Sequence, residues 1–430
     1  MQTKILLLAV FISTTLFAQT NLNEKQLDKK LKILQETTQT VGFSVAIVQG
    51  RKVIYAKGFG YKDLENKLKV DENTLFAIGS SSKAFTTALL GILEDEKGLK
   101  FTDSPKKYIP ELEFYNNDLN NNITILDMVS HRTGLPRHDF SWYLFPTEDK
   151  DSLLSRVQYH KPFTGIREQW YYNNFMYLAQ GIIAERLTGN SWEDNIRERF
   201  FKPLQMSTSN LSIKELEKSA NASKGYTLEN FSTNKLTPYY NIAAISPAGC
   251  INSSAKEMAN WLMIWLNEGK FNGKQVIPQQ YVEKAINPLM LVGNGIADKK
   301  FPAQHLNSYG YAWFTSSYKG HYRLEHGGNI DGFAANVSFF PSDGIGIVVL
   351  TNQDGSALPT LVRNEISDEI LNLKKTDWVA YYNEKVGELK KQQKEKKKTE
   401  EESEISNTNP THNLAEYTGE YSNKGYGTIK

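Results

Sequence analysis

The stretch FAIGSSSKAFTTALL, residues 76–90, joins a strand-like run to an apolar helix, with three serines at the junction. From Ala84 to Leu99 apolar residues recur at helical spacing and Gly98 marks the stop, which predicts a helix. Ser80 therefore lies at a helix N-terminus, where negative charge is stabilised. Lys83 follows on the same helix face, so its amine can reach the Ser80 hydroxyl. The spacing is that of a nucleophile beside a base.

Spacing alone does not choose this serine, because the same Ser-x-x-Lys pattern occurs at Ser80, Ser104, Ser232, Ser253 and Ser316. Only Ser80 combines a preceding strand-like segment with an apolar helix directly after it. A plain alternative is that Ser80 is a helix N-cap, a role that its two serine neighbours would fill equally well. From this segment alone both interpretations stay open.

The regions on either side indicate the fold class. Residues 42–61 form two β-rich runs joined by Gln49 and Gly50, which predicts a hairpin, and residues 120–290 contain several helix-period segments such as 175–188 and 255–267. Strand signals return in 309–352, with Ser342-Asp343-Gly344 as a turn, and a helix follows over 357–373. We predict one α+β domain, in which N- and C-terminal strands share an antiparallel sheet packed against a mostly helical middle.

Both ends of the chain differ from this domain. Residues 1–18 combine a basic Lys4 with an apolar run, which predicts a signal peptide and export to a periplasm or the outside, with no later span across a membrane. The domain is expected over 19–380 and a charged linker or solvated helix over 381–405. Residues 406–430 have the aromatic and glycine pattern of strands and are interpreted as the start of a small, incomplete β domain.

Composition excludes several function classes. The 50 basic and 48 acidic residues leave a net charge of +2, which is no electrostatic footprint for nucleic acid. The seven histidines form no zinc-binding spacing, and residues 131–136 are interpreted as a turn beside the substrate cleft, so neither metal nor cofactor is predicted. Cys250, the only cysteine, is expected to be a core residue.

Residues 76–90 resemble the nucleophile segment of the serine β-lactamase and penicillin-binding superfamily, in the branch shared with class C β-lactamases, D-alanyl-D-alanine carboxypeptidases and related esterases. That branch has a Tyr-x-Asn motif, which Tyr172-Asn173-Asn174 matches, and a Lys-Thr-Gly or His-x-Gly motif, which His326-Gly327-Gly328 matches in its second form. Further likeness at 131–139, 191–206 and 247–262 extends the resemblance over roughly residues 40–370.

The resemblance implies a role for each matched residue. Ser80 attacks the carbonyl, while Lys83 and Tyr172 accept and relay its proton. Asn174 hydrogen-bonds Lys83 or the substrate amide. The implied fold is that of β-lactamases and transpeptidases.

The glycine motif implies the opposite wall of the site. Backbone N–H groups of Ser80 and Asn329 would form the oxyanion hole, and His326, with Gly327 and Gly328 after it, would polarise Tyr172 or bind the polar end of the acyl group. A protonated His326 and Lys83 would each disfavour the other's proton and favour a tyrosinate between them. Class C β-lactamases have lysine where this chain has His326, so the resemblance leaves β-lactam hydrolysis open.

These observations predict a secreted serine hydrolase that forms an acyl-enzyme at Ser80 from a small-molecule or peptide substrate: a D-Ala-D-Ala-type peptide, a β-lactam or an ester. The alternative is a non-catalytic sensor that binds cell-wall fragments in the same cleft. The complete set Ser80, Lys83, Tyr172 and Asn174 favours catalysis. The sequence does not indicate an oligomeric state.

Overall fold

A central antiparallel sheet organises the protein, whose computed structural model describes residues 22–293, 304–403 and 410–430. Within these residues nine strands form the sheet, in the following order. They are β10 (Met290–Leu291), β11 (Ser308–Tyr309), β12 (Phe314–Tyr318), β13 (His321–Ile330), β14 (Phe333–Phe340), β15 (Ile345–Thr351), β1 (Gly42–Gln49), β2 (Lys52–Asp63) and β3 (Leu68–Lys69). β1 pairs with β15, with Val45 opposite Val349, so strands from the two ends of the domain adjoin. This confirms the predicted shared sheet.

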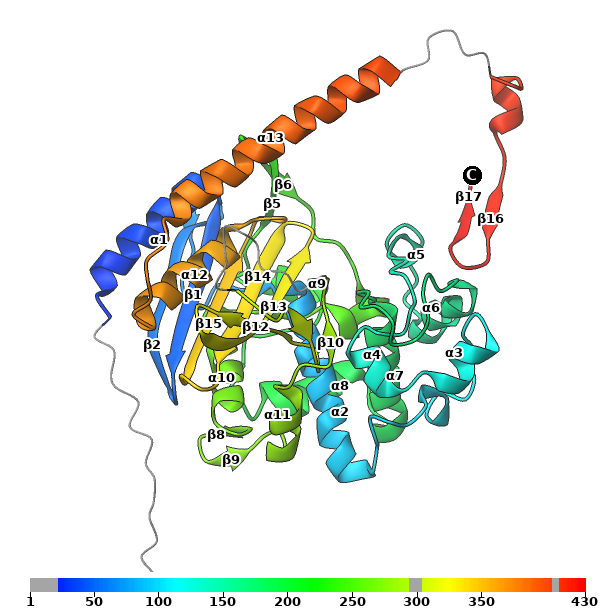
Figure 1. Cartoon of the computed structure of the whole chain (residues 1–430), viewed down its shortest axis with the longest axis horizontal. Helices are drawn as coiled ribbons and strands as arrows, with labels where there is room; N and C mark the ends of the chain where they lie inside the picture. Colours follow the sequence, from blue (N-terminus) through cyan, green and yellow to red (C-terminus); the bar gives the residue numbers. More distant parts are fainter. Residues whose placement is uncertain (1–21, 294–303, 404–409) are drawn as a thin grey trace, which may run out of the picture.

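The sheet is covered on both faces, as the side chains of β1 demonstrate. Val45 and Ile47 enter a core with α1 (Glu24–Thr38) and α12 (Leu358–Ile370), which lie together on one side of the sheet in Figure 1. The intervening Ala46 and Val48 enter the larger core on the other face. Because successive strand residues point to opposite faces, a strand buried on both sides needs the unbroken apolar run that β1 has.

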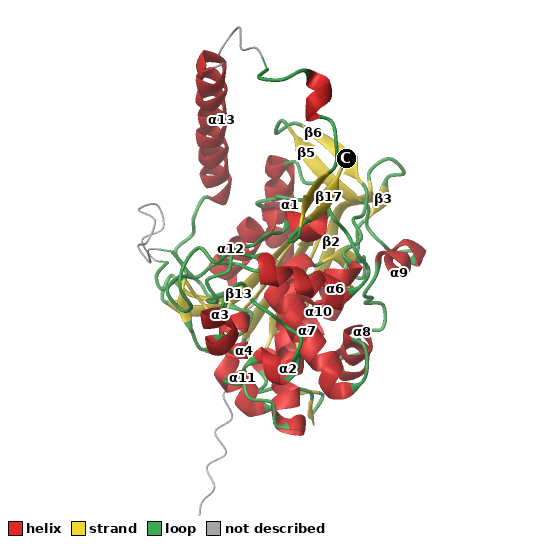
Figure 2. Ribbon diagram, turned by 90° about the vertical axis from the view of Figure 1, so that its right-hand side faces the viewer, coloured by secondary structure: helices red, strands yellow, loops and turns green. Residues whose placement is uncertain are grey.

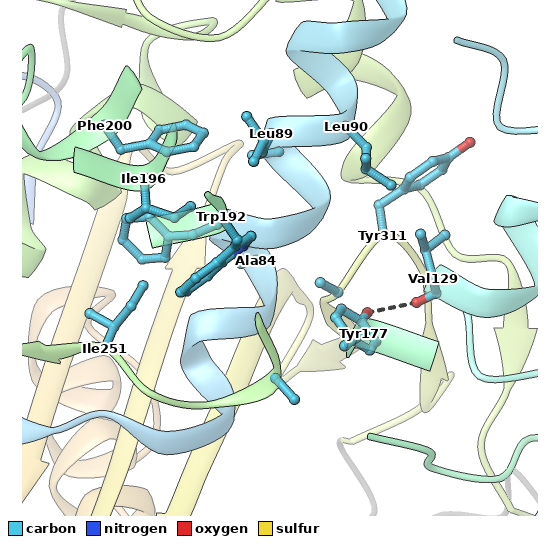
Figure 3. Packing of buried hydrophobic residues seen from close by; sticks show 14 of the residues in the cluster. Ala84, Leu89, Leu90, Val129, Tyr177, Trp192, Ile196, Phe200, Ile251 and Tyr311 are labelled. Carbon is cyan, nitrogen blue, oxygen red and sulfur yellow. Dashed lines mark hydrogen bonds between the residues drawn. The ribbon is translucent and has the colours of Figure 1, made fainter. Parts of the chain in front are cut away.

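The larger core lies in the helical half of the protein, as predicted for the middle of the chain. α2 (Lys83–Lys97) and α7 (Phe175–Thr188) cross its centre, and α10 (Ala255–Leu266) packs on the sheet (Figure 2). Figure 3 shows Leu89 of α2 packed near Phe200. The other helices of this half are α3 (Asn117–Asn122), α4 (Ile125–Val129), α5 (Phe140–Tyr143), α6 (Lys150–Ser155), α8 (Trp192–Ile196), α9 (Ile213–Lys218) and α11 (Gln279–Ala285).

Short strand pairs lie outside the central sheet. They are β4 (Phe76–Ala77) with β7 (Asn252–Ser253), β5 (Gly225–Glu229) with β6 (Thr233–Thr237), and β8 (Lys270–Phe271) with β9 (Lys274–Gln275). The β4 pair matters most for the site, because β4 leads directly into the serine-rich turn.

The C-terminal part leaves the sheet and returns to the helical half. α13 (Trp378–Ser403) extends away from the sheet as a long helix, the solvated helix that the charged composition allowed (Figure 1). β16 (Tyr421–Asn423) and β17 (Gly427–Ile429) then form a hairpin beside α5 and α6. The proposed division into domains stays a prediction, and the predicted signal peptide lies outside the described residues. Among the helices in the described ranges, none has the length and apolar content needed to cross a bilayer.

Candidate active site

Ser80 and Lys83 are placed by a tight turn that feeds α2. Residues Gly79–Ser82 form a 3-10 turn, and α2 begins at Lys83. The Lys83 amine nitrogen Nζ lies 3.1 Å from Ser80 Oγ and donates to the carbonyl oxygen of Ala248 over 2.6 Å. Ser80 is half-buried, whereas Lys83 is fully buried because the first turns of α2 are enclosed all round. A serine open to solvent thus contacts an amine that is not.

Burial also changes the protonation of this amine. Desolvation lowers the pKa of Lys83 well below its usual 10.5, and smaller effects come from Asp139, which raises it, and Arg137, which lowers it. A charged ammonium is disfavoured in a low-dielectric interior unless a carboxylate pairs with it. Lys83 is therefore suited to accept the Ser80 proton near neutral pH.

Tyr172 lies above the lysine. Lys83 Nζ is 4.9 Å from the centre of its ring, and the Arg137 guanidinium carbon is also 4.9 Å from it. Burial raises the pKa of Tyr172 above its usual value, and the nearby Ser80 hydroxyl only partly opposes this. Among the described residues, none is placed to form a well-aligned hydrogen bond with this buried hydroxyl. The expected tyrosinate is therefore wrong, because the cost of desolvating a phenolate exceeds the stabilisation from neighbouring cations.

His326 is buried behind the site and is neutral. Its Nδ1 lies 2.6 Å from the carbonyl oxygen of Gly327, and its Nε2 lies 3.0 Å from the Tyr309 hydroxyl. A carbonyl only accepts, so Nδ1 carries the proton and Nε2 accepts from Tyr309. Burial lowers the pKa of His326 to about 3, and Lys83 acts in the same direction. The expectation of a protonated His326 is wrong for the same reason of desolvation.

The structure adds His131 to the site, which the sequence placed only in a turn beside the cleft. Its ring is fully buried, 4.3 Å from the ring of Tyr172, and its Nδ1 accepts from the backbone N–H of Asn173 over 3.1 Å. Burial lowers the pKa of His131 well below 6.5. No spacing signal could have paired His131 with Tyr172, because the contact depends on how two distant loops pack.

Two tyrosines extend this network beneath Tyr172. The hydroxyls of Tyr177 and Tyr309 are 3.2 Å apart, and Tyr177 donates to the carbonyl oxygen of Val129 over 2.8 Å, the dashed line in Figure 3. Tyr309 in turn contacts His326 through its hydroxyl. Tyrosine is frequent in this chain, so neither residue carried a sequence signal of its own.

The serine turn and β13 are in direct backbone contact. A Cβ atom on Gly328 would lie 1.9 Å from the carbonyl oxygen of Ile78, and one on Gly79 would lie 3.0 Å from the backbone nitrogen of Asn329. Only glycine permits this approach, and Gly79 also has φ +50°. The contact brings the backbone of Ser80 next to that of Asn329, the pair that the resemblance assigns to the oxyanion hole.

Asn174 contacts Asp139 and not Lys83, so of the two partners implied for it the substrate amide stays a prediction. Its Nδ2 donates to Asp139 Oδ1 over 2.9 Å, and no hydrogen bond between Asn174 and Lys83 occurs in the described structure. Asp139 also accepts from the Arg137 guanidinium over 2.6 Å. Asn174 is therefore held by Asp139, and it lines the same cleft as Ser80.

An open cleft leads from solvent to Ser80, and Asn174 and Asn329 also line it. Lys83, Tyr172 and His326 lie behind this lining. The aromatic residues on its walls are Phe140, Trp142, Tyr143, Tyr171 and Tyr426, and its charged residues are Arg137, Asp139, Asp331 and Asp354. Within the described ranges, no three histidine, cysteine or carboxylate side chains are arranged to hold a metal ion.

Comparison with known proteins places this geometry in a family. The family model described as Beta-lactamase matches residues 27–371. The chain belongs to the beta-lactamase family. The match includes the sheet, the helical half and every predicted site residue, and it ends between α12 and α13.

Relatives in this family share modest identity over most of the chain. The unguisins hydrolase ungD' of Aspergillus campestris is 28% identical, over 90% of this chain and 73% of its own length. Protein flp of Staphylococcus aureus is 26% identical, over 84% of this chain and 69% of its own length. The octameric penicillin-binding protein homologue from Pyrococcus abyssi superposes with a TM-score of 0.72 at 23% identity, covering 82% of this chain and 78% of that one. This last likeness shows the beta-lactamase family fold.

Proposed function

We propose that the chain is an exported serine hydrolase that forms an acyl-enzyme at Ser80 from a peptide, amide or ester. The observation that carries the proposal is the 3.1 Å contact between Ser80 Oγ and the buried amine of Lys83. A serine hydroxyl is a weak nucleophile until a base takes its proton, and a lysine amine is a base only when its pKa is lowered. Burial lowers the pKa of Lys83 in this site.

In the first step Ser80 Oγ forms a bond to the substrate carbonyl carbon, and its proton passes to Lys83 Nζ. The carbonyl electron pair moves onto oxygen, where the N–H groups of Ser80 and Asn329 would donate to it. When the carbonyl re-forms, the bond to the leaving group breaks, and the leaving group takes a proton from Lys83 by way of Tyr172. Water then attacks the ester at Ser80, and the same proton transfers run in reverse.

We propose that Tyr172 acts as a proton relay and not as a base. The raised pKa of Tyr172 keeps its hydroxyl protonated, so it donates one proton while it accepts another. His326 is neutral and hydrogen-bonded on both nitrogens, which makes it a positioning residue behind Tyr172. A carboxylate on a substrate would gain no charge pairing from it.

The relatives support a hydrolytic reaction and leave the substrate to be proposed. One carries the name of a hydrolase and another is a penicillin-binding protein homologue. We propose an amide or peptide as the substrate class, with esters as alternative substrates. Export rests on residues 1–18, whose composition is that of a signal peptide.

The test is the intact mass of the protein after incubation with a fluorophosphonate and, separately, with a penicillin. Wild type should gain one fluorophosphonate adduct that Ser80→Ala lacks. Ser104→Ala is the matched control, because Ser104 has the same spacing to a lysine but caps a surface turn instead. A penicillin adduct would favour cell-wall peptides over simple esters. Folded wild-type protein without either adduct would contradict catalysis and leave the sensor alternative.

A further inference from the structure

The C-terminal hairpin contacts the helical half through its turn alone. Of the described residues 410–430, Gly425 is buried, Tyr426 and Gly427 are half-buried, and all the others are exposed. The hairpin lies beside α5 and α6 in Figure 1, far along the chain from both. We call residues 425–427 the hairpin tip.

Polar contacts fix the tip to the segment that includes α5. The Tyr426 hydroxyl lies 2.8 Å from Nδ1 of His138. Ser141 Oγ donates to the carbonyl oxygen of Gly425 over 2.6 Å, and the Arg156 guanidinium donates to that of Tyr426 over 3.3 Å. Docking removes the carbonyl groups of Gly425 and Tyr426 from water. Without the two donors these groups would be left without a hydrogen bond, so the donors stabilise docking.

The shape of the tip matches this surface as closely as its polar groups do. A Cβ atom on Gly427 would lie 2.8 Å from the ring of Phe145, and one on Gly425 would lie 3.1 Å from Cβ of Tyr159. Tyr426 itself packs edge-on against Phe145, with ring centres 6.2 Å apart. Glycine at 425 and 427 thus lets the tip approach Tyr159 and Phe145 more closely than a residue with a Cβ atom would.

The residues around α5 that contact the hairpin tip also form a wall of the active-site cleft. His138 and Asp139 line the cleft that contains Ser80, and Tyr426 lines the same cleft from the hairpin. Tyr426 and Ser80 therefore line one and the same cleft. The family match ends at residue 371, so this part of the wall comes from outside the matched region.

We propose that the hairpin tip is a wall of the active-site cleft, and that the Tyr426 ring limits the size of the group that reaches Ser80. The first half of this proposal stands on the contacts alone, and the second rests on the proposed function. Because an aromatic side chain fills a large volume, its removal should open the cleft to bulkier groups.

The size limit is tested by labelling rates in the full chain, with two fluorophosphonates that carry a small alkyl or a bulky aryl group. In Tyr426→Ala the rate for the bulky reagent relative to the small one should rise about 10-fold or more, the effect of a few carbon atoms in a pocket. Tyr426→Phe keeps the ring and should keep the wild-type ratio. Tyr421→Ala, on an exposed position of the same hairpin, is the control. An unchanged ratio in Tyr426→Ala would overturn the size limit.

Docking is tested without any chemistry, by amide hydrogen exchange in α5. The four-residue α5 is too short to be stable alone, so its protection depends on neighbours. Gly425→Val should undock the tip and speed exchange at Tyr143 and Leu144, whereas Tyr421→Ala should not. Unchanged exchange rates in Gly425→Val would contradict the proposal that the hairpin tip docks as a wall of the cleft. If wild-type protein is not labelled by either fluorophosphonate, the proposed catalytic function fails. The exchange rates in α5 would still show whether the hairpin tip docks.

Discussion

The floor and the wall of the cleft are built in contrasting ways. The floor, where the serine turn meets β13, is backbone against backbone, and Gly328 is so close to Ile78 that no side chain fits. The wall at the hairpin tip is held by a few hydrogen bonds and ring contacts, some buried, as between Ser141 and Gly425, and some half-buried, as between His138 and Tyr426. Dense packing makes the floor rigid, while a few surface contacts leave the wall easy to alter. Under the two proposals, the floor sets the catalytic geometry and the wall limits the substrate.

The largest effect is expected where the floor is tightest. Gly328→Ala would place a Cβ atom 1.9 Å from a backbone oxygen, so the turn or β13 must move. We expect a loss of about 3 kcal/mol or more in the free energy of unfolding, together with loss of fluorophosphonate labelling. Gly327→Ala is the matched control, because its nearest atom would lie 3.6 Å away, an ordinary contact. Equal urea midpoints for the two variants would show that the floor is adaptable.

A second floor substitution should separate activity from stability. Lys83 is fully buried with a lowered pKa, so at neutral pH it costs the folded protein stability that an unburied lysine would not. Protonation of this lysine favours the unfolded chain at any pH below its unfolded pKa. Lys83→Met should abolish labelling and raise Tm by about 2 °C or more.

Lys83→Arg should abolish labelling without that gain, because arginine stays charged. If Lys83→Met is labelled at the wild-type rate, Lys83 is not the base.

Acid should weaken the floor and the wall together. Burial lowers the pKa of His326, in the floor, and of His160, under the wall, each to about 3. Both are neutral when folded, and the unfolded chain binds their protons as pH falls below about 6.5, so stability is lost from there down toward pH 3. At pH 5 each costs about 2 kcal/mol.

Urea unfolding at pH 7.5 and pH 5 measures this loss. His160→Phe keeps a ring beside Phe175 without a titrating group and should recover part of the lost stability at pH 5. If the variant and wild type lose the same free energy of unfolding between pH 7.5 and pH 5, His160 is not held in its neutral form by burial.

The smallest effect is expected at the wall's hydrogen bonds. Ser141→Ala removes the donor to Gly425 and should loosen tip docking by about 1 kcal/mol. Exchange at α5 should accelerate roughly 5-fold, while the urea midpoint of the whole protein stays unchanged. Ser155→Ala removes an exposed local bond instead and is the control. A lower urea midpoint in Ser141→Ala would show instead that the wall unfolds together with the rest of the protein.

Local patterns in the chain predict part of the site. A spacing of three on a helix predicted the contact between Ser80 and Lys83. The charge states could not be predicted in this way, because the pKa values of Lys83 and His326 depend on burial, which no local pattern reports. The contacts of His131 with Asn173 and of Asn174 with Asp139 were missed for a related reason, since loops distant in sequence supply the partners.

By itself the sequence determined the fold class, the shared sheet of first and last strands, the helical middle and the position of the Ser80 turn. These follow from hydrophobic period and residue spacing, which act over a few residues at a time. Only the tertiary structure decided that Tyr172 and His326 are neutral and that Tyr426 lies in the cleft. Desolvation and contact between segments hundreds of residues apart depend on how the whole chain packs, and that information is in no single stretch of it.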